Sequence, residues 1–209
     1  MQDHPLLIST IFEHAIKNYN KQEIVSNTVE GGVHRYTYFD WGKRTKKLAN
    51  AFKSLDLKES DRVGTLAWNG YRHLEIYYAT SSSGLVCHTI NPRLHPDQVS
   101  YIVNHAQDKV LCVDLNILPL VEKASENFKT VKAIIIMTDN KNMVQPNIKN
   151  SINVICYEDF IKDHSDQFDW PQMDERTASS LCYTSGTTGN PKGVLYSHRS
   201  TVLHAYGMN

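Results

Sequence analysis

The residues best suited to chemistry lie together near the end of the chain, between positions 184 and 193. This segment reads Thr-Ser-Gly-Thr-Thr-Gly-Asn-Pro-Lys-Gly and follows an apolar stretch at 178–183 that predicts a strand. Its hydroxyls can donate to phosphate oxygens, its glycines let backbone N–H groups approach a polyanion, and Lys192 supplies a positive charge. This composition indicates a phosphate-binding loop. The structural alternative is a flexible Gly/Ser/Thr hairpin at the end of a sheet.

Two common loops of similar composition are excluded by position. A Walker A loop requires G-x-x-x-x-G-K-[ST], but Pro191 stands where the second glycine must be, and Gly193 stands where the magnesium-binding hydroxyl must be. A nucleophile elbow requires G-x-S-x-G, but Tyr183 and Thr187 occupy the two glycine positions around Ser185. The segment therefore predicts neither a P-loop NTPase nor a hydrolase with Ser185 as its nucleophile.

A longer stretch around this loop resembles the AMP-binding signature of adenylate-forming enzymes, which include acyl-CoA synthetases, luciferases and nonribosomal adenylation domains. It reads Tyr183-Thr-Ser-Gly-Thr-Thr-Gly-Asn-Pro-Lys-Gly-Val194 and continues Leu195-Tyr-Ser-His-Arg-Ser200. Asn190 stands where many members carry a charged residue, at a loop position that tolerates change. Upstream blocks resemble the branch that acts on medium- and long-chain fatty acids, so the resemblance covers essentially all 209 residues: Trp68-Asn-Gly-Tyr-Arg-His73, Asn91-Pro-Arg-Leu-His-Pro96 and Tyr101-Ile-Val-Asn-His-Ala106.

The resemblance implies a two-step ligase. A fatty carboxylate attacks the α-phosphate of ATP and releases pyrophosphate, and the acyl adenylate then passes its acyl group to the thiol of coenzyme A, with Mg²⁺ accompanying the ATP. The loop embraces the β- and γ-phosphates, so it contributes positioning and electrostatic stabilisation, and no catalytic residue is assigned within the chain. The implied phosphate ligands are the hydroxyls of Thr184, Ser185, Thr187 and Thr188, the backbone at Gly186, Gly189 and Gly193, and the Lys192 cation.

The same resemblance makes residues 1–209 the N-terminal portion of the AMP-binding large domain. The remainder of that domain, the C-terminal domain and most of the acyl tunnel would lie beyond Asn209, so the isolated chain is expected to be inactive. Acyl chain length and oligomeric state do not follow from this segment. An aryl- or amino-acid-adenylating member of the same superfamily stays open as an alternative, and so does a non-catalytic remnant that serves only as an interaction module.

The rest of the sequence predicts an α/β fold that would hold this loop. From residue 62 onward strands alternate with helices, and the strands are continuous apolar runs typical of a mostly parallel sheet with flanking helices on both faces. We expect strands near 62–67, 86–90, 110–113 and 132–137 to lie parallel in one sheet with right-handed crossovers. The strands at 178–183 and 194–197 are expected to pair as an antiparallel hairpin in a neighbouring sheet.

The N-terminal third predicts a helix at 6–19, a β-hairpin at 23–28 and 33–37, and a helix at 38–55. Thr37 has the chemistry of an N-cap, with Asp40 three positions later. The second of these helices carries a cationic run. Its predicted role is a solvated helix face, with a peripheral contact to a membrane or an acidic partner as the alternative. The run consists of Lys43, Arg44, Lys46 and Lys47.

Composition excludes several function classes. The 22 basic and 22 acidic side chains give a net charge of zero, so no basic field favours nucleic acid. The longest aliphatic run, at 133–137, is much shorter than the about 20 residues that cross a bilayer. No basic region precedes the apolar residues 6–8, which predicts a cytosolic protein without a secretory signal.

Other candidate residues receive structural interpretations. The cysteines fit neither a C-x-x-C pair nor a disulfide framework and are predicted to be free and buried. The histidines near the middle of the chain lack a partner at metal-ligand spacing, so no metal site is predicted. The aromatic group around residues 68–78 is predicted to be core, and the last two histidines to have surface or packing roles. These residues are Cys87, Cys112, Cys156, Cys182, His88, His95, His105, Trp68, Tyr71, Tyr77, Tyr78, His198 and His204.

Overall fold

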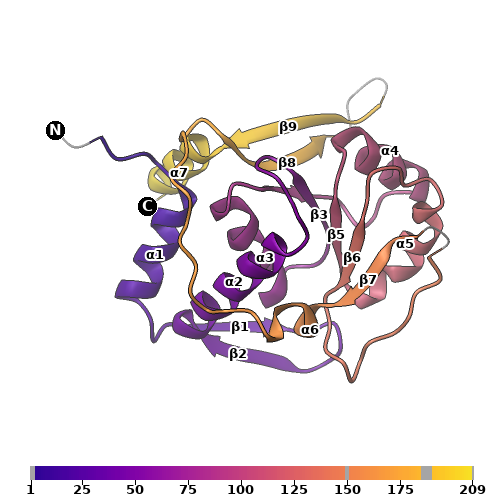
Figure 1. Ribbon diagram of the computed structural model, residues 1–209, viewed down its shortest axis with the longest axis horizontal. Helices are drawn as coiled ribbons and strands as arrows, with labels where there is room; N and C mark the ends of the chain where they lie inside the picture. The colour runs from indigo at the N-terminus through magenta and orange to yellow at the C-terminus, as the bar shows by residue number, and fades with distance from the viewer. Residues whose placement is uncertain (1–2, 149–150, 185–189, 209) are drawn as a thin grey trace.

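The computed structural model describes residues 3–148, 151–184 and 190–208. Within these residues seven strands form one sheet in the order β7-β6-β5-β3-β4-β8-β9, and a separate two-stranded hairpin lies beside it (Figure 1). All neighbours in the large sheet are parallel except β8 and β9. The strands are β1 (Glu23–Asn27), β2 (Val33–Thr37), β3 (Arg62–Leu66), β4 (Val86–Thr89), β5 (Val110–Val113), β6 (Ala133–Ile136), β7 (Asn153–Cys156), β8 (Ala178–Thr184) and β9 (Lys192–Ser197).

Helices cover both faces of the large sheet. On one face, α2, α3 and α6 pack on a core cluster that includes Val63, Val110 and Ile135. On the other face, α4 and α5 pack on a cluster that includes Leu111 and Ile134. The helices are α1 (Ile8–Asn18), α2 (Tyr38–Lys53), α3 (Tyr71–Ser82), α4 (Pro96–Ala106), η1 (Leu115–Ile117), α5 (Leu118–Ser125), α6 (Tyr157–Lys162) and α7 (His198–Gly207).

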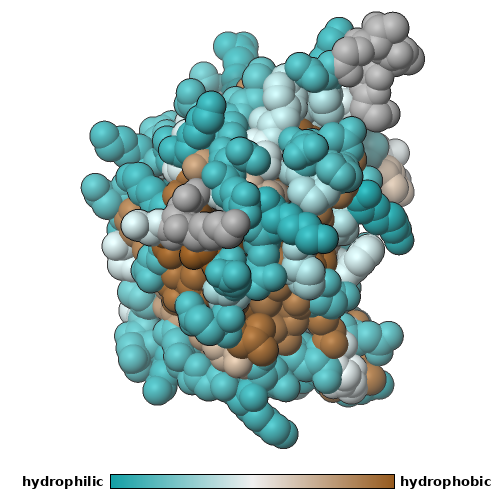
Figure 2. All heavy atoms as spheres, turned by 90° about the vertical axis from the view of Figure 1, so that its right-hand side faces the viewer, coloured by the Kyte–Doolittle hydropathy of each residue, from teal (hydrophilic) through white to brown (hydrophobic). Residues whose placement is uncertain are grey.

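Strand alternation explains this three-layer arrangement. Successive side chains of a strand point to opposite faces, so the fully apolar strands β5 and β6 contribute to both clusters. Figure 2 views the molecule from the side of α4 and α5 and shows apolar side chains reaching the surface between hydrophilic ones. Partly buried residues that pack against this second cluster include Leu120, Met143 and Ile152. The predicted α/β class and the parallel arrangement of the four strands are confirmed.

The placement of the β8–β9 hairpin differs from the prediction. The two strands are antiparallel as expected, but β8 also pairs in parallel with β4, so the hairpin belongs to the large sheet. The middle of β8 is buried, with Ser179, Ser180 and Leu181 each less than a tenth exposed. Buried backbone N–H and C=O groups need partners on both sides, and the otherwise free edge of β4 supplies them.

The small hairpin and the first helices form a separate aromatic cluster. Gly31 and Gly32, at φ +95° and +96°, form the turn between β1 and β2, where a left-handed backbone favours glycine. Thr37 and Asp40 make the capping box that starts α2. Tyr71 packs in this cluster with Tyr78 beside it, as predicted, whereas Trp68 is 37% exposed.

A network of ion pairs joins α2, α3 and α6, and it corrects the prediction of a fully solvated cationic face on α2. Arg44 donates from Nε to Glu75 Oε1 at 2.8 Å and from Nη1 to Glu158 Oε2 at 2.9 Å. Glu75 is completely buried and also accepts a hydrogen bond of 2.6 Å from the hydroxyl of Tyr157. Lys43, one residue before Arg44, is exposed as expected.

A second arginine extends this network to the small hairpin. Arg72 donates to Glu158 Oε1 at 2.9 Å and to Glu30 Oε1, in the β1–β2 turn, at 2.7 Å. Although burial opposes ionisation of Glu158, the hydrogen bonds and charges of Arg44 and Arg72 hold the pKa of Glu158 below its ordinary value. The hairpin is therefore attached to the helical layer by charge as well as by aromatic packing.

The cysteines are free, as predicted. Cys87, Cys112 and Cys156 are buried, but Cys182 is only partly buried because it lies near the open end of β8. In the part of the chain that the structure describes, no helix is both long and apolar enough to span a membrane.

We predict that Arg44→Met destabilises the protein by about 3 kcal/mol or more, because it leaves the buried Glu75 carboxylate without its charged partner. Chemical denaturation measures the change, with Lys43→Met as the matched exposed control, for which we expect a change within about 0.5 kcal/mol. Adding Glu75→Gln to the Arg44 variant should recover part of the loss. Equal effects of the Arg44 and Lys43 substitutions would contradict the importance of the network.

Candidate phosphate-binding site

The two ends of the predicted phosphate loop are the last paired residues of β8 and β9. Thr184 pairs with Lys192, and Tyr183 pairs with Gly193 one step further into the sheet. Thr184 and Lys192 are both exposed. The other residues assigned to phosphate, Ser185, Gly186, Thr187, Thr188 and Gly189, lie outside the described residues.

The sheet topology places these ends at the edge where α/β proteins bind ligands. Because β8 runs parallel to β4, Thr184, the last residue of β8, lies at the carboxyl ends of the parallel strands. In open α/β sheets, ligands bind in the crevice outside this edge. The two described ends of the predicted loop, Thr184 and Lys192, therefore lie at an edge of the sheet where ligands can bind.

The described groups at this edge suit an anionic ligand. Lys192 is exposed and cationic, forms no ion pair with another described residue, and is paired across the strands with Thr184, whose hydroxyl is a potential donor. Paired residues of neighbouring strands share a face of the sheet, so both side chains start from the same side of the hairpin. No group of three or more His, Cys, Asp or Glu in the described ranges could hold a metal ion.

The histidines weighed as metal ligands have other partners. His88 Nδ1 lies 2.9 Å from both carboxylate oxygens of Asp108, and both side chains are fully buried. Burial raises the pKa of Asp108, while the hydrogen bond from His88 opposes this rise. His95 caps α4 by accepting from the backbone N–H of Asp97, and His105 Nδ1 lies 2.6 Å from the hydroxyl of Tyr183.

The contact of His105 with Tyr183 and the His88–Asp108 pair are absent from the predictions. The first brings α4 together with β8 across 78 positions, and the second brings β4 together with the segment before β5 across 20 positions. No local spacing in the sequence signals such contacts. The one signal in the sequence that points to the contact of Tyr183 is its position as the first residue of the signature.

Helix α7 begins directly after β9 and is fixed at its start. The Ser197 side chain accepts from the backbone N–H of Ser200 as an N-cap. His198 is buried, and its Nδ1 accepts a hydrogen bond of 3.2 Å from the backbone N–H of Ile8 at the start of α1. Arg199 forms an ion pair with Glu175, whose other carboxylate oxygen accepts from the backbone N–H of Leu6. The end of β9 is thereby tied to the N-terminal helix, and His198 has the packing role predicted for it.

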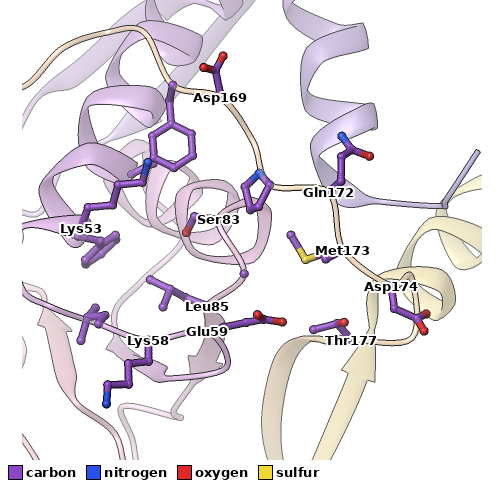
Figure 3. Close-up of a pocket in the computed structure, with 16 residues that line it drawn as sticks. Lys53, Lys58, Glu59, Ser83, Leu85, Asp169, Gln172, Met173, Asp174 and Thr177 are labelled. Carbon is purple, nitrogen blue, oxygen red and sulfur yellow. The ribbon is translucent and has the colours of Figure 1, made fainter.

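A cavity of about 470 Å³ lies at the opposite edge of the sheet (Figure 3). It is lined by residues that precede strands, such as Glu59 before β3, Leu85 before β4 and Thr177 before β8. Met173 points into it from the connection between α6 and β8 (Figure 3). Because these residues mark the amino ends of the parallel strands, the cavity is separate from the carboxyl edge where the signature lies.

The comparison with known families decides the class of protein. The profile of the family described as "AMP-binding enzyme" matches residues 12–209. The chain belongs to this family. It is 48% identical over its whole length to a 3-methylmercaptopropionyl-CoA ligase of Ruegeria lacuscaerulensis and 47% identical over 98% of its length to a medium-chain fatty-acid CoA ligase of Ectopseudomonas oleovorans. A long-chain fatty-acid CoA ligase of Thermus thermophilus is 40% identical over 98% of the chain.

The chain spans only 36–38% of the length of these relatives. Solved structures of a CoA ligase and an acyl CoA synthetase share its fold. A crystal structure of an anthranilate CoA ligase in complex with anthranoyl-AMP superposes with a TM-score of 0.82 at 23% identity, covering 99% of this chain and 38% of that one. A Mycobacterium tuberculosis fatty acyl CoA synthetase gives a TM-score of 0.68 at 18% identity, covering 92% of this chain and 35% of that one.

We predict that His198 makes the protein less stable in mild acid. Burial lowers the pKa of His198 below its ordinary value of 6.5, so the unfolded chain takes up the proton first as the pH falls. The stability that neutral His198 contributes is present above pH 6.5 and is lost as the pH falls through the lower folded-state pKa.

The test compares unfolding free energies at about pH 7 and pH 5 for the wild type and for His198→Asn, whose amide oxygen can replace Nδ1 as acceptor but does not titrate. We expect the variant to lose less stability on acidification. His34 and His73, whose pKa values are also lowered by burial, are common to both proteins and cancel in the comparison. An unchanged pH dependence would contradict the prediction.

Proposed function

We propose that this chain supplies the phosphate-binding part of an ATP-dependent ligase that joins a carboxylic acid to coenzyme A. In the first step the carboxylate oxygen bonds to the α-phosphorus of ATP while the bond to the β-phosphate bridging oxygen breaks and pyrophosphate leaves. In the second step the thiol of coenzyme A attacks the acyl carbonyl, and AMP leaves. The observation that carries the proposal is the position of Thr184 and Lys192, exposed and paired at the carboxyl edge of the sheet.

In this proposal Lys192 and Thr184 hold phosphate oxygens of ATP, together with the residues between them that the signature assigns. A positive charge fixed beside the leaving pyrophosphate stabilises charge that develops in the transition state. Mg²⁺ would arrive with ATP and share this charge. The chain's own contribution is to present the lysine and hydroxyl groups from a hairpin held in the large sheet.

A fatty acid is the acid that we propose, because relatives that match 98% of the chain at 47% and 40% identity are named for medium- and long-chain fatty acids. A shorter, sulfur-containing acid is a second candidate, because the 48% identical relative is named as a 3-methylmercaptopropionyl-CoA ligase. ATP–pyrophosphate exchange by the full-length ligase, with 3-methylmercaptopropionate beside fatty acids of increasing length, separates the two.

We also propose that residues 1–209 form the N-terminal portion of the AMP-binding large domain. The share of each relative that the chain spans supports this division. An exposed apolar surface on β9 and α7 supports it too, with Leu195 61%, Leu203 46% and Tyr206 61% exposed. These side chains belong to the last strand and helix that the structure describes, and exposed large apolar side chains favour contact with another part of a protein.

For the full-length ligase we predict that Lys192→Ala lowers the rate of adenylation roughly ten-fold to thousand-fold, the range for removing one preorganised stabiliser of charge. The fold should be intact because the exposed Lys192 side chain has little packing to lose. ATP–pyrophosphate exchange and thermal melting are measured together, with the exposed Lys21→Ala as control. Unchanged exchange, or a large melting shift without a specific rate effect, would contradict the role of Lys192.

We further predict that the 209-residue chain alone forms neither acyl adenylate nor acyl-CoA. Attack requires the carboxylate and the α-phosphate to be held in a near-attack arrangement, worth as much as about 7 to 11 kcal/mol of the barrier. The exposed apolar side chains of β9 and α7 should also favour association of the isolated chain. The test is pyrophosphate exchange beside size-exclusion chromatography, and acid-dependent exchange by a purified monomer would overturn the prediction.

A further inference from the structure

The side chain of Tyr183 connects the signature hairpin to helix α4. Its hydroxyl lies 2.6 Å from His105 Nδ1, and its ring meets the His105 ring edge-on with centroids 5.8 Å apart. His105 is in turn stacked on Tyr101, with centroids 5.4 Å apart and the rings inclined by 22°. The carboxyl end of β8 is thus attached to an element that packs on the face of the same sheet.

The buried His88–Asp108 pair packs against Tyr183 through the ring of His88. The ring of His88 lies 5.2 Å from the ring of Tyr183. Asp108 reaches His88 because Gly64 carries no side chain, since a Cβ there would lie 3.0 Å from Asp108 Oδ2 and 2.5 Å from Leu111 Cδ2. Within the described part of the chain, His88 Nε2 is buried without a hydrogen-bond partner, so this pair acts on Tyr183 through ring packing.

On the other strand, Tyr183 covers Gly193. The two residues are paired across β8 and β9, and a Cβ on Gly193 would lie only 3.2 Å from Tyr183 Cζ. A Cβ at this distance would require the tyrosine ring or Gly193 to shift by a few tenths of an ångström, so glycine lets the ring lie close against the paired strand. The next pair beyond this contact is Thr184 with Lys192. The orientation of the Tyr183 ring therefore affects the separation of β8 and β9 at the pair next to Thr184 and Lys192, the proposed phosphate ligands.

We propose that Tyr183, held by His105, is a positioning residue that sets the placement of Thr184 and Lys192 for ATP phosphates. The inference rests on the proposed function for its consequence in catalysis, but the contact itself is a property of the described residues. Tyr183 acts through the strand pair and does not touch the reacting atoms. Its hydroxyl fixes the ring, the ring lies against Gly193, and this contact keeps Lys192 beside Thr184.

The test replaces Tyr183 with Phe in the full-length ligase and measures hydrogen exchange at the backbone amides of Thr184, Lys192 and Gly193. Loss of one hydrogen bond of ordinary strength should speed exchange there roughly 2- to 10-fold. The matched control is Tyr196→Phe, on the same hairpin, because Tyr196 is 46% exposed and its hydroxyl makes no hydrogen bond within the described residues. Equal exchange in the two variants would overturn the inference.

Kinetics provide a readout that a purely structural role would not change. We expect Tyr183→Phe to lower kcat for ATP–pyrophosphate exchange roughly 2- to 10-fold with little change in the melting temperature. His105→Ala should have the same effect without adding to it in the double variant, and His105→Gln, which can still accept from the hydroxyl, should restore most of the activity. Additive effects, or no rescue by Gln, would contradict positioning through this hydrogen bond.

The two readouts separate the inference from the proposed function. A wild-type ligase that exchanges no pyrophosphate with any acid would contradict the proposed function, while the amide exchange would still decide whether Tyr183 holds the hairpin. Normal activity together with unchanged amide exchange in Tyr183→Phe would overturn the positioning role and leave the proposed function intact.

Discussion

The parallel pairing of β8 with β4 is the constraint on which the candidate site depends. Its register pairs Cys87 with Ser180 and Thr89 with Cys182, which brings the last strand hairpin onto the large sheet. An isolated two-stranded hairpin is at best marginally stable in water, so β9 alone could not fix the end of β8. Ser180, Leu181 and Cys182 have partners on both sides, so the end of β8 at Tyr183 and Thr184 continues from a strand that is supported by β4 and β9.

A second constraint is the network of ion pairs among α2, α3 and α6, the helices on one face of the large sheet. Arg44 and Arg72 neutralise Glu75 and Glu158 between α2, α3 and α6, and Glu30 brings the small hairpin into the same network. Carboxylates this deeply placed are tolerated only when they are paired and hydrogen-bonded. The charges therefore specify how three helices meet on a face where apolar contacts alone would allow several arrangements. None of these five side chains belongs to the signature, and their ion pairs join the helices and the small hairpin.

The sequence predicts those parts of the fold whose cause is local. Continuous apolar runs such as 110–113 predict buried parallel strands, and the spacing of Thr37 and Asp40 predicts the capping box. It does not predict that Arg44 is drawn from a cationic run into a buried network, because the partners Glu75 and Glu158 lie 31 and 114 positions away. The prediction that β8 and β9 belong to a neighbouring sheet is wrong because it, too, concerns partners that are distant in the sequence. The neighbours of a strand depend on which edge of the sheet is still unpaired. At the site, the motif identifies Lys192 and Thr184 as candidates, but the ring packing beneath them follows only from the three-dimensional arrangement.

The relatives show why this segment is more informative about the family than about the acid. Enzymes named for 3-methylmercaptopropionate and for medium-chain fatty acids match the chain at 48% and 47% identity, although these acids differ in length and chemistry. The degree of identity over this segment therefore does not distinguish the two acids. A hairpin that binds ATP phosphates would be under the same geometric demand in either enzyme, because pyrophosphate is the leaving group whichever acid attacks. In our proposal the contacts of Tyr183 with His105 and Gly193 are of this kind, since they position the hairpin and not the acid. The matched segment covers little more than a third of each relative's length, so residues outside it are available to select the acid in the proposed ligase.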